Sequence, residues 1–166
     1  MIIDFFNTEC NEPVQNNSFF GICDNQHGTK AYTDIENENT WVAMVENTNK
    51  LDTVFTPIDN CIVILKDGTN DKESTCDGML TFRNSIYLVE LKEQRTGGWL
   101  PDAIGQLENT IKLIEKAHNI NDIRFKKAYA CNKKHPHFHV IDVERKRRFY
   151  TDTGFRIDAQ AKIFIK

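Results

Sequence analysis

The chain has 166 residues, of which 40% are hydrophobic and 27% charged, with a formal net charge of −3. This size and composition favour one globular domain spanning residues 1–166. No apolar run reaches the roughly 18 residues of a membrane span, and acids stand where a secretory signal would carry basic residues, so we expect a cytoplasmic protein without a membrane partner.

The charge is divided unevenly along the chain. Residues 1–90 hold five Lys or Arg against 15 Asp or Glu, whereas residues 91–166 hold 16 against nine. The second half would meet a polyanion such as nucleic acid if it forms one surface, whereas interleaved halves would only neutralise each other.

The cysteines are five in number and include no C-x-x-C pair. This pattern favours neither a disulfide framework nor a zinc ribbon. We therefore expect most of them to be reduced, with Cys61 and Cys131 buried in apolar strands.

The N-terminal half predicts an irregular region, a helix and a strand. Residues 7–30 are rich in Asn, Gln, Gly and Asp, which is typical of irregular structure. A helix is predicted over 34–49 from the helical spacing of Ile35, Glu38, Val42 and Val45, which places Glu38 on the inward stripe. The short β-branched run "CIVILK" then predicts a strand over 61–66.

The central part predicts a β-hairpin followed by a long helix. "DGMLTF" and "SIYLVELKE" read as two strands joined at Arg83-Asn84, by a loop of two residues or, since neither residue is Gly, of three or four. Gly97-Gly98 ends the second strand, and a 3.6-residue apolar period from Leu100 to Ile114 predicts a helix beginning near Trp99.

The C-terminal part predicts more strands. "FKKAYAC" indicates a buried strand over 125–131, and "HFHVIDVE" and "AKIFIK" indicate peripheral strands. The expected fold is therefore an α/β core over 34–131 in the order helix, strand, strand, strand, helix, strand, with a mixed sheet flanked by helices.

Three charged residues stand inside the predicted hairpin. With a two-residue loop, Phe82 pairs with Ser85, so Asp77 lies opposite Glu90, and Lys92 shares the face of Glu90. Both faces are otherwise apolar, as in strands covered on both sides, where an unpaired charge costs several kcal/mol.

Two carboxylates about 4 to 6 Å apart repel unless a cation lies between them, so a Mg²⁺ or Mn²⁺ ion is expected here. Beside it, the Lys92 ammonium could orient an attacking water and stabilise charge on a phosphodiester.

Asp77 followed by Glu90-Leu91-Lys92, in this order of elements, resembles the PD-(D/E)XK nuclease superfamily, to which restriction endonucleases and archaeal Holliday junction resolvases belong. The resemblance implies that Asp77, Glu90 and the main-chain carbonyl of Leu91 bind the metal and that Lys92 is the catalytic lysine. It also implies a further carboxylate from the first helix, for which Glu38 is preferred over Glu46, and a supporting Gln106. Cys76 stands where the motif name has Pro.

These residues predict a metal-dependent endonuclease that hydrolyses phosphodiester bonds of DNA, and a homodimer or successive nicks would be needed to cut both strands. One alternative is a catalytically silent binding or regulatory subunit of a defence or repair complex that keeps the nuclease fold. Another is an unrelated α/β domain in which Glu90 and Lys92 are merely exposed at a strand end.

Two further clusters carry weaker signals. His135, His137 and His139 would share one face of a strand and could bind Zn²⁺, although a polar edge strand explains them more simply. The run "ERKRR" at 144–148 could contact phosphates or be a solvated strand end.

Overall fold

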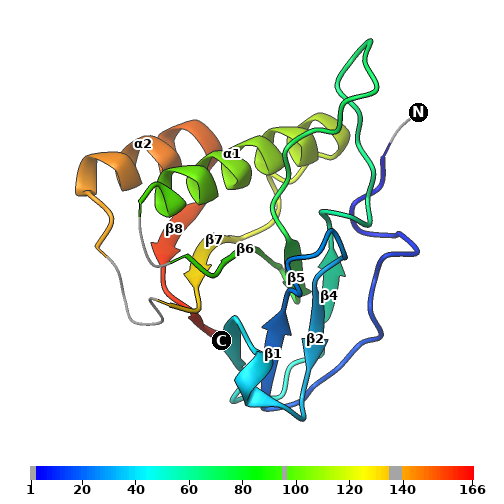
Figure 1. Cartoon of the computed structure of the whole chain (residues 1–166), viewed down its shortest axis with the longest axis vertical. Coiled ribbons are helices and arrows are strands. Elements are labelled where there is room, and N and C mark those ends of the chain that lie inside the picture. The colour runs from blue at the N-terminus through cyan, green and yellow to red at the C-terminus, as the bar shows by residue number, and fades with distance from the viewer. Residues whose placement is uncertain (1–2, 95–96, 135–139) are drawn as a thin grey trace.

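A mixed sheet with the strand order β4-β5-β6-β7-β8, here called the central sheet, forms the middle of the protein (Figure 1). The structure is a computed structural model and describes residues 3–94, 97–134 and 140–166. Strands β4, β5 and β6 run antiparallel, and β6, β7 and β8 run parallel. The five strands span Val54–Pro57, Gly78–Phe82, Ser85–Lys92, Phe125–Asn132 and Arg156–Ala159.

Helices α1 (Trp99–Ala117) and α2 (Val143–Thr153) cover one face of the central sheet. A second sheet, here called the outer sheet, covers the other face with the strand order β2-β1-β3-β9. Its strands are β1 (Phe19–Cys23), β2 (Tyr32–Asp34), β3 (Ala43–Glu46) and β9 (Lys162–Phe164), and a short 3-10 helix η1 (Glu38–Thr40) precedes β3. The fold is thus a mixed α/β arrangement.

The two apolar faces of the hairpin are buried in different cores, as the sequence predicted. Met79 and Leu88 pack with Leu107 of α1 between the central sheet and the helices. Leu80 and Val89 pack between the two sheets. The hairpin therefore lies in a sheet that is covered on both sides.

The hairpin, the α1 helix and the strand over 125–131 are confirmed, and so is a strand within "AKIFIK". In contrast, the helix predicted over 34–49 is wrong, because these residues form the end of β2, then η1 and β3. The Asp34 side chain accepts the backbone N–H of Asn37, and the Asn37 side chain accepts that of Asn39. Such local side-chain bonds compete with helix formation.

Three other predictions need correction. The strand over 61–66 is wrong: the strand that precedes the hairpin is β4, residues 61–64 form a turn, a bend and coil, and Leu65 makes only an isolated bridge with Lys72. The N-terminal region is less irregular than predicted, because it contains β1. The strand predicted for "HFHVIDVE" is wrong over its described residues, because 140–142 are coil and 143–148 belong to α2, which the Asp142 side chain caps by accepting the N–H of Glu144. The predicted histidine cluster at 135–139 lies outside the described residues.

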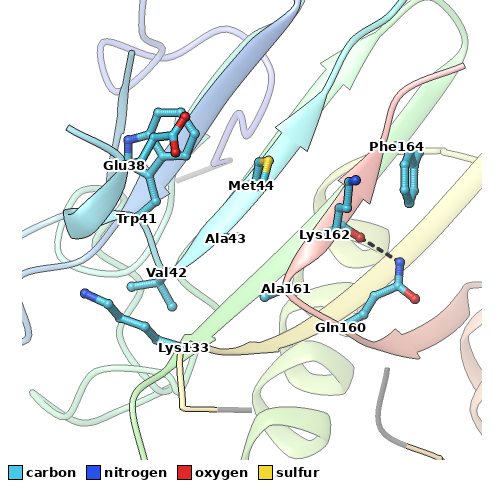
Figure 2. A pocket seen from close by; sticks show the side chains of 10 residues that line it. All are labelled: Glu38, Trp41, Val42, Ala43, Met44, Lys133, Gln160, Ala161, Lys162 and Phe164. Atoms are coloured by element: carbon cyan, nitrogen blue, oxygen red, sulfur yellow. Dashed lines mark hydrogen bonds between the residues drawn. The ribbon is translucent and has the colours of Figure 1, made fainter. Parts of the chain in front are cut away.

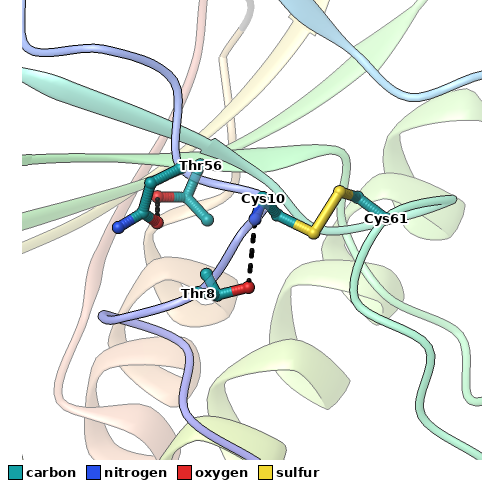
Figure 3. Close-up of a disulfide and its surroundings, with 5 residues drawn as sticks. Thr8, Cys10, Thr56 and Cys61 are labelled. Atoms are coloured by element: carbon teal, nitrogen blue, oxygen red, sulfur yellow. Dashed lines mark hydrogen bonds between the residues drawn. A yellow bond between two sulfur atoms is a disulfide. The ribbon is translucent and has the colours of Figure 1, made fainter.

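A disulfide joins Cys10 to Cys61 (Figure 3). The prediction of a reduced Cys61 in a buried strand is therefore wrong. Cys131 is free and buried in β7 as predicted, and Cys23 and Cys76 are also free and buried. Within the described part of the chain, no helix is both long and apolar enough to span a membrane.

Candidate active site

The hairpin loop has two residues, the shortest of the lengths left open by the sequence, and this fixes which side chains meet at its open end. Phe82 pairs with Ser85, and Gly78 pairs with Val89, so the next residues outward are Asp77 and Glu90. The Asp77 N–H donates to Glu90 Oε1 at 3.1 Å, and the Leu91 N–H donates to Asp77 Oδ2 at 2.7 Å. The structure therefore brings the two predicted carboxylates together.

Lys92 and Gln106 complete this constellation. Lys92 Nζ lies 3.2 Å from Glu90 Oε2 and donates to Gln106 Oε1 at 2.8 Å. Gln106 comes from α1, and its Nε2 donates to the Thr75 carbonyl at 3.3 Å. Gln106 thus connects the lysine to the segment that leads into Asp77, and it holds the ammonium on the side of Glu90.

The segment before Asp77 is also anchored to α1. The Cys76 N–H donates to Thr110 Oγ1 at 2.7 Å, and the Thr110 hydroxyl donates to the Gln106 carbonyl at 2.8 Å. Helix α1 therefore positions both Lys92 and Asp77. These contacts fix two side chains that are 15 residues apart in the sequence against one rigid element.

Burial dominates the electrostatics of the carboxylate pair. Glu90 is only 2% exposed. Desolvation raises its pKa well above the ordinary value, the Asp77 charge raises it further, and Lys92 opposes the shift. Desolvation also raises the pKa of Asp77 to about 6, while the Leu91 N–H opposes that shift. A group of opposite charge between the two carboxylates would therefore be bound favourably.

The pair opens into a polar cleft of about 500 Å³. Asp24, from the loop after β1, and Asp59, from the turn after β4, line this cleft, and their charges raise the pKa of Asp77. The Asp59 N–H donates to the Cys76 carbonyl at 3.2 Å, which holds this turn beside the strand. Sequence reasoning missed both acids, since each stands in a loop without a motif.

The structure does not bring Glu38 or Glu46 to this cleft. Glu38 is exposed on η1, outside any α-helix, and lines a different hollow. Glu46 ends β3 in the outer sheet, paired with Phe164 of β9. The helix that was to carry the third carboxylate is absent from 34–49, so these two acids are separated from Asp77.

The donor set suits a hard divalent cation. Asp77, Glu90 and the Leu91 carbonyl offer oxygen atoms, which Mg²⁺ and Mn²⁺ prefer, and water would supply the other positions. In the described parts of the chain, no group of three or more His, Cys, Asp or Glu side chains is arranged as a metal cluster.

Comparison of the chain with protein-family models, with curated proteins and with solved structures finds no match.

Proposed function

We propose that this protein is a Mg²⁺- or Mn²⁺-dependent endonuclease of the PD-(D/E)XK type that hydrolyses phosphodiester bonds of DNA. The observation that carries the proposal is the convergence of Asp77, Glu90 and Lys92 in one cleft, with the Lys92 ammonium held between Glu90 and Gln106. The order of β4, β5, β6, α1 and β7 supports it, because it matches the last five elements of the order that the resemblance implies, which is helix, strand, strand, strand, helix, strand; the first helix of that order is absent from 34–49.

The charge of the cleft favours a metal-dependent reaction. Five acids line it, and Lys92 is the cationic residue of the lining formed by the described residues; the acids are Asp24, Asp59, Asp77, Glu90 and Glu93. A phosphodiester would be repelled by these acids unless a bound cation offset them. The ion would polarise the phosphate and lower the pKa of a bound water.

The protein side chains would then share the remaining work. Asp77, Glu90 and the Leu91 carbonyl would hold the ion, and Lys92 would donate hydrogen bonds to the attacking water or to the charged phosphoryl oxygens. Gln106 would act as a positioning residue, because it contacts Lys92 rather than the reacting atoms.

The surroundings of the cleft offer groups that could meet the DNA backbone. β7 is parallel to β6, and Asn132 lies in register with Lys92, so Lys133 and Lys134 follow at the same end of the sheet. The Lys133 N–H donates to the Lys92 carbonyl at 2.9 Å. Two further lysines thus stand at the edge of the acidic cleft, where phosphate groups flanking the scissile bond would lie.

The test is a cleavage assay with purified protein, Mg²⁺ or Mn²⁺, and supercoiled, linear, single-stranded and branched DNA, with RNA as a further substrate. We expect Lys92→Ala to lower the rate by about 100-fold or more, the size typical of losing one charge-stabilising donor. Lys112→Ala, an exposed lysine of α1, is the matched control and should cleave as the wild type does.

Two results would contradict the proposal. Cleavage that Lys92→Ala leaves unchanged would reject this cleft as the active site. Nucleic-acid binding without cleavage under either metal would favour the silent binding or regulatory subunit instead. Calorimetric titration with Mn²⁺ tests the metal site independently of cleavage, because Asp77→Asn should weaken Mn²⁺ binding whether or not the protein cleaves nucleic acid.

A further inference from the structure

A second hollow of about 500 Å³, here called the apolar groove, lies on the outer sheet (Figure 2). Ala43 and Ile163 point into the core between the sheets, so the alternating residues Met44, Lys162 and Phe164 face away from the central sheet. Figure 2 shows Met44 between Trp41 and Phe164. The groove therefore has an apolar floor and an aromatic residue at each side.

The Trp41 ring is held in one position. Its indole N–H donates to Asp34 Oδ2 at 2.8 Å. The ring lies against Gly21 of β1 so closely that a Cβ on Gly21 would come within 1.9 Å of it. Phe164 on the other side is 37% exposed, and the Lys162 ammonium lies 5.1 Å from the centre of its ring. A flat ligand would thus meet one fixed wall and one accessible aromatic ring.

The apolar groove is connected to the catalytic cleft through Lys133. Lys133 lines the groove, and its Nζ lies 3.7 Å from Glu93 Oε1 and donates to the Asn39 carbonyl at 2.7 Å. Glu93 in turn lines the cleft. A ligand that occupies the cleft can therefore extend past Lys133 into the groove.

We infer that the apolar groove binds an unpaired base of the nucleic acid whose backbone enters the cleft, so that the substrate is single-stranded or locally unpaired. This inference rests on the proposed nuclease function. Bases stack on aromatic side chains with about 1–3 kcal/mol per base and little dependence on sequence. A base inside a duplex is already stacked and paired and cannot enter without leaving the helix.

The charges at the rim favour a polyanion over a peptide strand or a second copy of the chain. In the described lining, two lysines stand against one acid, Glu38. Lys133 and Lys162 flank the apolar floor and could each meet a phosphate. Lys162 and Lys166 are exposed near the edge strand β9, which has only three residues. Short edge strands with lysines resist pairing with another strand.

The test is fluorescence anisotropy of a labelled six-nucleotide single strand of thymidylates, with Ca²⁺ in place of the catalytic metal. We expect Phe164→Ala to raise the Kd about tenfold, and Phe164→Tyr to restore it because the ring is kept. Phe125→Ala is the matched control, since Phe125 is 49% exposed and begins β7 at the end opposite Lys133. Binding of a blunt duplex should not change in either alanine variant.

The salt dependence separates stacking from charge. Lys162→Ala should lower the slope of log Kd against log salt concentration by about 0.7, as expected for one lost phosphate contact on a single strand. Phe164→Ala should leave that slope unchanged. Melting temperatures of all variants show whether the outer sheet is intact.

An unchanged Kd in Phe164→Ala, or an equal loss for single strand and duplex, would overturn the inference. A change of oligomeric state in Phe164→Ala without a change in Kd would instead make the groove a contact between copies, and would also overturn it. If no substrate is cleaved but binding still depends on Phe164, the catalytic proposal fails and the groove assignment stands.

Discussion

The two ends of the β5–β6 hairpin share one backbone geometry but differ in chemistry. At the loop end, Arg83 and Asn84 are exposed, and the rings of Phe82 and Tyr87 meet edge to face at 4.8 Å. At the open end, two carboxylates are withdrawn from water, with Glu90 only 2% exposed. Burying such a charge costs several kcal/mol before its partners are counted.

The charged residues at the open end do not stabilise the hairpin; other residues do. At the loop end, the two strands pair through aromatic and polar residues. Between the two ends, the paired residues are apolar and pack in the two cores. The open end also receives most of the extra bracing, from α1 through Thr110 and Gln106 and from the turn that carries Asp59. Such bracing is expected where side chains must be held in a costly arrangement for a function.

Reducing the disulfide should have the largest effect, and it should affect the open end first. Cys10 and Cys61 are 51 residues apart. By lowering the conformational entropy of the unfolded chain, the disulfide adds about 4 kcal/mol to the free energy of unfolding in the loop-entropy model. Cys61 directly follows Asp59 and Asn60, which line the cleft. We expect a dithiol to lower the free energy of unfolding by about that amount, as measured by denaturant titration.

The Cys10→Ser/Cys61→Ser double variant provides the control, because its stability should match the reduced wild type and should not respond to the dithiol. Hydrogen exchange locates the effect along the chain. Amide protection should fall more at Asp59 than at Phe125, whose N–H donates to the Asn84 carbonyl at the loop end. An equal fall at both ends would contradict the view that the disulfide braces only the open end.

The pH dependence of stability should show the cost of the carboxylate pair directly. The folded protein raises the pKa of Asp77 to about 6, from an ordinary value near 3.8. The folded state therefore binds this proton more tightly than the unfolded state, so its stabilising contribution is full below about pH 4 and is lost as the pH rises through about 6. The difference between a pKa of about 6 and one near 3.8 corresponds to a change of about 3 kcal/mol in the free energy of unfolding.

This prediction requires a metal-free buffer and a reference without the pair. In EDTA, the free energy of unfolding of the wild type should fall by about 3 kcal/mol or more between pH 4 and pH 7, relative to the Asp77→Asn/Glu90→Gln double variant. Adding Mn²⁺ at pH 7 should restore stability in the wild type alone. The same pH profile in both proteins would show that ionising Asp77 and Glu90 does not destabilise the folded state, which would contradict this prediction.

The open end of the hairpin could be predicted from the sequence because its determinants are local. Period-two alternation places Glu90 and Lys92 on one face, and a short loop at 83–84 brings Asp77 to the same end of the hairpin at any of its possible lengths. Helix α1 follows from its 3.6-residue period, so Gln106 was expected in the right region. The charges stood out because both faces around them are apolar.

The rest of the site depends on pairings between distant segments, which the sequence does not display. Val42 and Val45 fit a helical spacing, yet alternation of buried and half-buried residues along β3 fits a strand equally well. The choice is made by the antiparallel partner β1 and by the parallel partner β9 near the C-terminus. In the same way, no local pattern pairs Cys10 with Cys61 or brings Asp24 and Asp59 to the cleft.

The smallest expected effect concerns the loop end and tests whether the two ends are independent. Arg83 adopts a φ of 46°. This left-handed conformation is energetically unfavourable for a residue with a Cβ but not for glycine. Asn84 does not adopt it. We expect Arg83→Gly to raise the free energy of unfolding by about 0.5–1 kcal/mol, and Asn84→Gly to lower it slightly by increasing the entropy of the unfolded chain. Denaturant titration gives both values, and calorimetry should find the same Mn²⁺ affinity as in the wild type. A changed Mn²⁺ affinity in Arg83→Gly would mean that relaxing the loop shifts the strand register at Asp77. The geometry of the carboxylates at the open end would then depend on the backbone conformation of the loop.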